Sequence, residues 1–163
     1  MSAGGGDGHL TVDRDLAKLA PRFRAAVEAA IAECRRAGLD AWVYEARRSE
    51  ALQAHYYQKG RTIVPPTRPV TNARTALKSW HGYGLAVDVV HRRKFWQPDG
   101  GQLWFKQVAA IFKRHDCKWG GDWTSPDPPH FQWHRCKPSP SDVARHLLAT
   151  RGIAAVWAAV EAD

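Results

Sequence analysis

The stretch that most constrains this chain covers residues 79–90 and reads SWHGYGLAVDVV. Its second half alternates apolar residues with small or polar ones, the period of two of a half-buried strand. The apolar members are Leu85, Val87 and Val89. Asp88 is therefore expected on the face opposite these side chains. His81 precedes it in the same stretch, and imidazole plus carboxylate is a usual pair of zinc ligands.

A third ligand is available downstream, in the sequence DPPHFQWH of residues 127–134. His130 and His134 have the i, i+4 spacing with which two histidines on one helix share a zinc. The intervening Phe-Gln-Trp is typical of a strand, however, and four residues of a strand span about 13 Å. Metal bonds of about 2 Å then exclude both histidines from one ion.

The two stretches together resemble the zinc peptidases that share a fold with D-Ala-D-Ala carboxypeptidases and the hedgehog signalling domain. The first family motif is Ser-x-His-x-x-Gly-x-Ala-x-Asp, and it is matched by Ser79, His81, Gly84, Ala86 and Asp88. The second motif, Glu/Asp-x-x-His before an aromatic strand, is matched by Asp127 and His130.

A third match lies upstream, in Arg48-Ser49, Gln53, Tyr57 and the segment 60–62. The combination is most similar to the L-alanyl-D-glutamate endopeptidase branch, which includes many phage endolysins. The resemblance extends over residues 16–134.

The resemblance implies a zinc ion held by His81, Asp88 and His130, with a fourth position left for water, as in catalytic zinc sites. Asp127 is then the general base that passes a proton to the leaving amine. The alternative for Asp127 is to cap the turn made by Pro128 and Pro129. His134 is expected at the rim of the site.

Arg48 is expected to face the carbonyl oxygen that becomes negative during attack. The chain departs from the family at Arg47, where relatives usually carry an aromatic residue. The same resemblance suggests three residues that contact substrate, namely Ser79, Gln53 and Tyr57.

The expected fold class is α+β, a single domain in which a small, mainly antiparallel sheet is flanked by helices. Apolar spacing predicts helices from Pro21 to about Gly38, from Ser49 to Lys59, and around Trp104 up to His115. Strands are expected over 39–44 and in the two motif stretches. Residues 61–78 are expected to form a long loop and residues 119–123 a tight aromatic turn.

Three parts of the chain are expected. Residues 1–12 form a flexible leader, residues 13–137 the zinc peptidase domain, and residues 138–163 a C-terminal helical extension packed on it. The alternative for the C-terminal helices is an outward-facing surface that contacts an envelope.

The formal net charge of +8 favours an anionic partner. The basic residues are scattered and no nucleic-acid-binding motif accompanies them, so we expect no nucleic acid and at most weak contact with an anionic envelope. Cys34, Cys117 and Cys136 lack metal-site spacing and are expected reduced, with a Cys117–Cys136 bridge as the alternative. A monomer is expected.

The N-terminus lacks the pattern of a secretory signal, and no apolar run is long enough for a membrane helix. We therefore expect a protein that stays in the cytoplasm of the producing cell until it is released, by a holin-type pore, to act on the cell wall.

The function that the resemblance implies is cleavage of the L-alanyl-D-glutamate bond in the stem peptide of bacterial peptidoglycan, as an endolysin that degrades the wall and causes lysis. Two rivals remain. One is a D,D-carboxypeptidase that removes terminal D-alanine, and the other is a non-catalytic, zinc-containing binding module of the same fold. Asp127 and Arg48 count against the second rival, because a binder needs neither.

Overall fold

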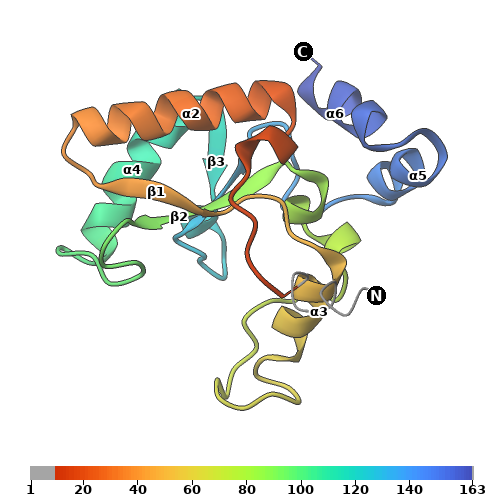
Figure 1. Ribbon diagram of the computed structural model, residues 1–163, viewed down its shortest axis with the longest axis horizontal. Helices are drawn as coiled ribbons and strands as arrows, with labels where there is room; N and C mark the ends of the chain where they lie inside the picture. The colour runs from red at the N-terminus through yellow and green to blue at the C-terminus, as the bar shows by residue number, and fades with distance from the viewer. Residues whose placement is uncertain (1–9, 163) are drawn as a thin grey trace, which may run out of the picture.

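The computed structural model describes residues 10–162, and Figure 1 shows a curved sheet with helices on both sides of it. Most of the expected leader, residues 1–9, lies outside the described residues. The strands are β1 (Ala41–Glu45), β2 (Ala86–His91), β3 (Cys117–Trp119) and β4 (His130–Trp133). They pair antiparallel in the order β1-β2-β4-β3. The expected α+β class is confirmed.

The longer helices are α2 (Pro21–Arg36), α3 (Glu50–Gln58), α4 (Gln102–Arg114), α5 (Asp142–Arg151) and α6 (Ile153–Glu161). Short 3-10 turns connect them: η1 (Leu16–Lys18), η2 (Ala76–Lys78), η3 (Trp80–Tyr83) and η4 (Gly120–Asp122). The predicted helices and the two motif strands are therefore present. The strand β3 was not predicted, because the sequence there indicates an aromatic turn.

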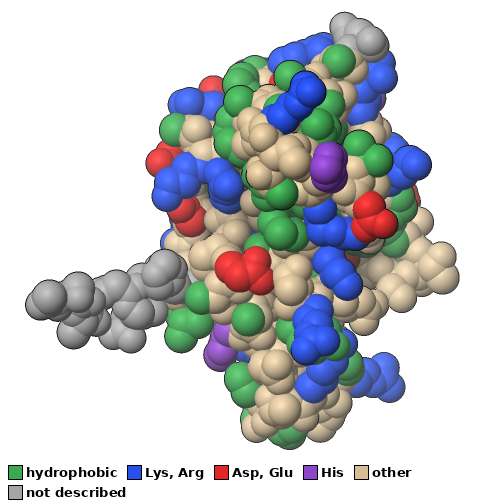
Figure 2. Space-filling model, turned by 90° about the vertical axis from the view of Figure 1, so that its right-hand side faces the viewer, with side chains coloured by type: hydrophobic (Ala, Val, Ile, Leu, Met, Phe, Trp, Pro, Cys, Tyr) green, Lys and Arg blue, Asp and Glu red, His purple; other side chains and the backbone are tan. Residues whose placement is uncertain are grey.

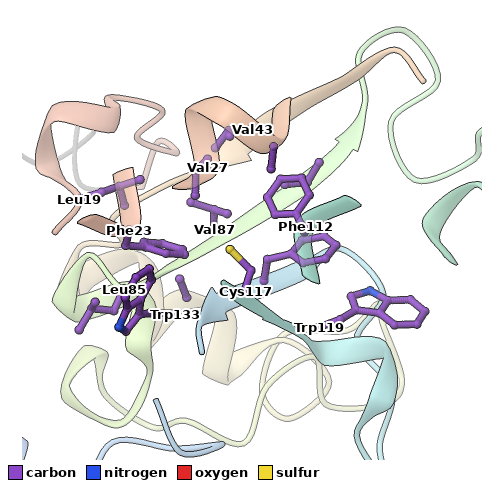
Figure 3. Packing of buried hydrophobic residues seen from close by; sticks show 14 of the residues in the cluster. Leu19, Phe23, Val27, Val43, Leu85, Val87, Phe112, Cys117, Trp119 and Trp133 are labelled. Atoms are coloured by element: carbon purple, nitrogen blue, oxygen red, sulfur yellow. The ribbon is translucent and has the colours of Figure 1, made fainter. Parts of the chain in front are cut away.

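One face of the sheet packs against α2 and α4. In Figure 3, Phe23 and Val27 of α2 lie next to Val87 of β2, and all three are fully buried. On the other side of this core, Phe112 of α4 stacks on Phe131 of β4 with ring centroids 4.2 Å apart. Successive strand residues point to opposite faces, so the neighbours of Val87 and Phe131 face away from these helices.

The C-terminal helices are attached to the core by hydrogen bonds from two indoles. Trp157 Nε1 in α6 donates to the Tyr83 carbonyl at 2.6 Å, and Trp133 Nε1 in β4 donates to the Val160 carbonyl at 3.2 Å. Val156 is fully buried in the common core. The helix α6 therefore contacts both the end of η3 and the end of β4, while the division of the chain at residue 137 stays a prediction.

The helix α2 is capped by a distant residue. Its N-cap, Ala20, has no side chain that could accept a hydrogen bond, and Pro21 occupies the first helical position. The Glu161 carboxylate of α6 instead accepts from the Arg22 amide at 2.8 Å, across 139 positions of sequence. A carboxylate at a helix N-terminus satisfies a free N–H group and complements the helix dipole.

The three cysteines are free and buried, as expected for a reduced set. Burial raises the pKa of the Cys34 thiol to about 12 and raises that of Cys117 as well, so these thiols stay protonated. Within residues 10–162, no helix has the length and apolar character to cross a membrane.

Candidate metal centre

Three side chains that could bind one metal ion meet on the face of the sheet away from α2. His81 belongs to η3, Asp88 to β2, and His130 is the first residue of β4. Asp88 and His130 are directly paired between the two strands, so their side chains share one face. One ligand atom from each residue lies within 4.8 Å of those of the other two.

The turn that carries His81 depends on two local features. The Ser79 hydroxyl caps η3 and accepts from the His81 amide at 3.4 Å. Gly84 ends the turn with a left-handed φ of 69°, and a Cβ there would lie 2.5 Å from the Lys18 carbonyl oxygen. The spacing of the first motif therefore allows the chain to turn directly from His81 into β2.

The hydrogen bonds of His81 determine which ring nitrogen faces the site. Its Nδ1 lies 3.0 Å from the carbonyl oxygen of Ala46, which can only accept, so Nδ1 carries the proton. Its Nε2 then presents a lone pair 3.3 Å from Asp88 Oδ1. That Nε2 is buried without a hydrogen-bond partner, as expected of an atom that a cation would satisfy.

His130 is held in the complementary tautomer. Gln132 Nε2 donates to the Lys137 carbonyl at 2.8 Å, which turns Gln132 Oε1 toward His130 Nε2, also at 2.8 Å. His130 Nε2 must therefore donate, and Nδ1 presents a lone pair 3.8 Å from Asp88 Oδ1. Such outer hydrogen bonds orient ligating histidines in metal sites.

Burial and nearby charges favour a neutral His130 and an ionised Asp88. Burial lowers the pKa of His130 to about 4, so its imidazole is neutral near pH 7. Burial would raise the pKa of Asp88, but His81, Arg48 and His130 together hold it well below the usual range. The hydrogen bonds of the two histidines leave one ring nitrogen of each free to bind, and together with the Asp88 carboxylate this donor set fits a divalent metal ion.

Arg48 lies beside the cluster in a fixed orientation. Its Nε donates to Glu45 Oε1 at 2.8 Å, its Nη1 to Gln53 Oε1 at 2.8 Å, and its Nη2 to Glu45 and, at 3.4 Å, to Asp88. These contacts use four of the five N–H groups of a guanidinium. Burial would lower the pKa of Arg48, but Asp88 and Glu45 raise it, so the cation is maintained.

Asp127 is positioned by backbone contacts. Its amide donates to the Gly120 carbonyl at 2.9 Å, and its carbonyl accepts from the His130 amide at 3.1 Å. The residue stays accessible to solvent. Desolvation by nearby protein and then the negative charge of Asp88 nevertheless raise the pKa of its carboxyl group to about 6. Asp127 is thus close enough to Asp88 for the charge of Asp88 to raise its pKa, although Asp127 is not one of the three clustered ligands.

The remaining predicted residues have different surroundings. Gln53 is fully buried and holds Arg48, while its amide nitrogen donates to the Ala73 carbonyl at 2.6 Å. Tyr57 lies against Arg61, whose guanidinium carbon is 3.7 Å from the ring centroid. The tyrosine against Arg48 is Tyr56, at 4.7 Å.

Other residues with no assigned role also contact the site. Glu45 anchors Arg48 and Gln132 orients His130. The sequence held a signal for Gln132, because it is two positions from His130 on a strand and so shares its face. It held one for Tyr56 as well, which is three positions after Gln53 on a helix. His134 lies just past the end of β4, and its amide donates to the Asp116 carbonyl at 3.0 Å.

Two imidazoles and a carboxylate that converge next to a fixed arginine, on the small sheet of an α+β fold, are typical of metal-dependent hydrolases. Comparison with known proteins narrows this class. Residues 72–133 match the family model described as D-alanyl-D-alanine carboxypeptidase. This segment contains all three clustered ligands and Asp127.

A structural match points to the same group. The crystal structure of Serratia marcescens L-Ala D-Glu endopeptidase ChiX superposes with a TM-score of 0.54 at 25% sequence identity. The match covers 78% of this chain and 93% of that one. Together, the two comparisons support assignment of this chain to the peptidase family of D-Ala-D-Ala carboxypeptidases and L-alanyl-D-glutamate endopeptidases.

Proposed function

We propose that this protein is a zinc-dependent peptidase that cleaves the L-alanyl-D-glutamate bond in the stem peptide of bacterial peptidoglycan. The observation that carries the proposal is the pair of buried histidines, each of which directs an unprotonated nitrogen toward Asp88. The similarity to an L-Ala D-Glu endopeptidase supports the choice of bond.

Zinc would be held by His81 Nε2, Asp88 and His130 Nδ1, a mixed nitrogen and oxygen set that this ion accepts. When bound there, zinc would acidify a water molecule and polarise the carbonyl of the scissile bond. The hydrogen bonds from His81 to Ala46 and from His130 to Gln132 keep both rings in the ligating tautomer. The protein therefore holds the ligands ready before the ion binds.

Asp127 is proposed as the general base. A pKa of about 6 leaves most of its carboxyl group ionised at pH 7, and it keeps more basicity than an ordinary aspartate. A carboxylate of this kind can accept a proton from the attacking water and return it to the leaving amine. Its position after the η4 turn leaves it accessible to both.

Arg48 is proposed to stabilise the carbonyl oxygen as it becomes negative. The contacts with Glu45, Gln53 and Asp88 fix the guanidinium and leave one N–H group for the substrate. A donor that is oriented before the reaction does not need to reorganise during it. Gln53 then acts through Arg48, while Ser79 supports His81 and Tyr57 remains a candidate substrate contact.

The wider role that we propose is that of an endolysin, a monomer released from the producing cell through a holin-type pore to degrade the wall. The cationic surface is suited to weak contact with an anionic envelope. Figure 2 shows Lys and Arg side chains spread over several parts of one face, without the single stripe expected of a nucleic-acid interface. The second candidate, a D,D-carboxypeptidase, is favoured by the description of the family model that matches residues 72–133.

Mass spectrometry of muropeptides after digestion of purified peptidoglycan tests the proposal. The expected products are stem peptides that begin with D-glutamate, with L-alanine left on muramic acid. Loss of terminal D-alanine alone would establish the carboxypeptidase instead. A metal analysis of the same preparation should find about one zinc per chain. Digestion of neither bond by the zinc-loaded protein would favour the non-catalytic module.

A further inference from the structure

Four aromatic side chains form a row that the proposed chemistry does not use. Trp42 and Tyr44 come from β1, and Phe95 and Trp96 come from the turn after β2. We call these four residues the aromatic row. Tyr44 lies 4.7 Å from Trp96 between ring centroids, and Trp42 lies 6.3 Å from Phe95. Phe95 and Trp96 are 39% and 51% exposed, which is unusual for adjacent large apolar residues.

The row lies on the same face of the sheet as the metal ligands. Trp42 pairs with Val90, which is two residues from Asp88 on β2 and therefore on its side of the sheet. Glu45 pairs with Asp88 itself. Tyr44 of the aromatic row is therefore the chain neighbour of Glu45, which holds Arg48.

Two irregularities of the backbone present these rings. The register of β1 shifts between Val43 and Glu45, so Tyr44 is an extra residue without a partner on β2. Bulges of this kind redirect a side chain and are frequent beside active sites. Phe95 has a left-handed φ of 50°, a conformation that is unfavourable for a bulky residue. Strain of this kind is typical of functional positions.

A cation completes the row. The guanidinium carbon of Arg14 lies 4.8 Å from the Trp42 ring centroid and 4.9 Å from that of Tyr44. It stabilises both rings by cation–π contact and carries N–H donors beside them. Phe95 and Trp96 are nearly parallel, with an interplanar angle of 26° and centroids 6.0 Å apart.

We propose that the aromatic row binds the amino-sugar strand to which the stem peptide is attached. Exposed aromatic faces pack well against the C–H groups of a pyranose ring, because the ring face is electron-rich. Arg14 would donate to the hydroxyl and acetamido oxygens. The row carries no negatively charged residue, and its flat, half-exposed rings suit a sugar chain better than an extended peptide.

The inference rests on the proposed function and sharpens it. The alanine of the scissile L-alanyl-D-glutamate bond is the residue attached to the muramic acid sugar. One peptide residue spans at most about 3.6 Å, so the sugar must lie close to the metal site during this cleavage. Removal of a terminal D-alanine would place the sugar several residues further away. A sugar site beside Glu45 therefore favours cleavage next to the glycan.

The test compares two substrates that differ only in the sugar. One is an N-acetylated stem peptide, and the other is the same peptide on its muramic acid disaccharide. The measured quantity is kcat/KM for the sugar-linked peptide divided by kcat/KM for the free peptide. The Trp96→Ala substitution should lower this ratio by about tenfold, the scale of one lost aromatic contact. Trp96→Phe should retain an intermediate ratio. The control is Val143→Ala on α5, a residue 67% exposed outside the row, which should keep the wild-type ratio.

A second measurement tests sugar binding directly and does not depend on hydrolysis. Titration of tryptophan fluorescence with the β-1,4 tetramer of N-acetylglucosamine should saturate for the wild type and for Val143→Ala, and be much weaker for Trp96→Ala. An unchanged cleavage ratio together with no tetramer binding would overturn the sugar site and leave the peptidase intact. Tetramer binding without hydrolysis of either substrate would reject the peptidase and keep the sugar site. A dimer that Trp96→Ala converts to monomer, with no sugar effect, would show that the row is a protein interface and would also overturn the inference.

Discussion

The two faces of the sheet are built from the same strands but are filled by different chemistry. On the face toward α2 and α4, side chains such as Val87 and Phe131 are fully buried among apolar neighbours. On the other face, the adjacent residues Asp88 and His130 join a polar cluster with Arg48, Gln132 and His81. Because side chains alternate along a strand, each ligand sits next to a residue that anchors it.

This comparison shows how the site is made rigid without being made apolar. The packed face stabilises the fold and holds the strands in place. Asp88 and His130 belong to the same strands, so their side chains on the polar face are also held in place. Asp127 differs from both, because it belongs to a loop and is held by backbone hydrogen bonds to Gly120 and His130. Substitutions on the two faces should therefore have separable effects.

The largest effect is expected on the polar face. Asp127→Asn removes the proposed base while keeping its shape, so turnover should fall by roughly two to four orders of magnitude with zinc content unchanged. Asp122→Asn changes an exposed carboxylate of the neighbouring turn and should leave turnover near wild type. Zinc content measured beside turnover checks both. Loss of zinc from Asp127→Asn would make Asp127 a ligand and contradict its role as base.

Substitutions on the packed face should instead lower the free energy of unfolding. Phe131→Ala removes the ring stacked on Phe112 and leaves a cavity, which should lower the free energy of unfolding by about 3–5 kcal/mol. Leu103→Ala on the exposed side of α4, where the residue is 59% exposed, should change it by less than about 0.5 kcal/mol. Denaturant unfolding measures both. If the Phe131→Ala variant folds but does not bind zinc, then substitutions on the two faces do not have separable effects.

A smaller effect is expected where a polar residue supports a ligand. Gln132→Ala removes the acceptor for His130 Nε2 and should weaken zinc binding by about 10–100-fold. Gln132→Glu keeps an acceptor oxygen and should weaken it less. Competition with a chelator gives the affinities. Equal zinc affinity in all three proteins would mean that Gln132 does not set the orientation of His130.

The smallest effect is expected in the loop. A Cβ at Gly120 would lie 2.6 Å from the Asp127 carbonyl oxygen and 2.9 Å from His130 Cβ, so Gly120→Ala must displace one of them. A shift of less than 1 Å should lower turnover by about tenfold. Gly38→Ala is the control for backbone strain, because φ is +80° there but the space is open. It should reduce stability slightly without changing turnover, and a similar loss of turnover in both variants would contradict the crowding argument.

Local patterns account for what the sequence predicts correctly. The alternation around Asp88 and the apolar spacing of α2 and α4 arise from contacts between residues close in sequence, which periodicity records. The same reasoning places His130 on a strand and separates it from His134. The clustering of His81, Asp88 and His130 follows from family motifs, and their role as zinc ligands stays a proposal.

Features that arise between distant segments could not be predicted in this way. The strand β3 has three residues and is formed by pairing with β4, so its own pattern is too short to reveal it. The role of Glu45 depends on Arg48 folding back over the end of β1. The aromatic row requires a bulge in β1 and a left-handed residue after β2, and neither leaves a pattern in the sequence.

The cap that Glu161 provides for α2 has a consequence for the order in which the chain matures. The helix α6 is synthesised after every strand and after all three clustered ligands, yet its carboxylate is needed at the start of α2. The hydrogen bonds of the Tyr83 carbonyl, beside the His81 turn, and of the Trp133 indole of β4 also cannot form before α6 has been synthesised. A ribosome-bound chain that lacks α6 therefore carries every ligand residue but not the contacts that α6 makes with α2, η3 and β4, and these contacts can form only once translation has passed Glu161.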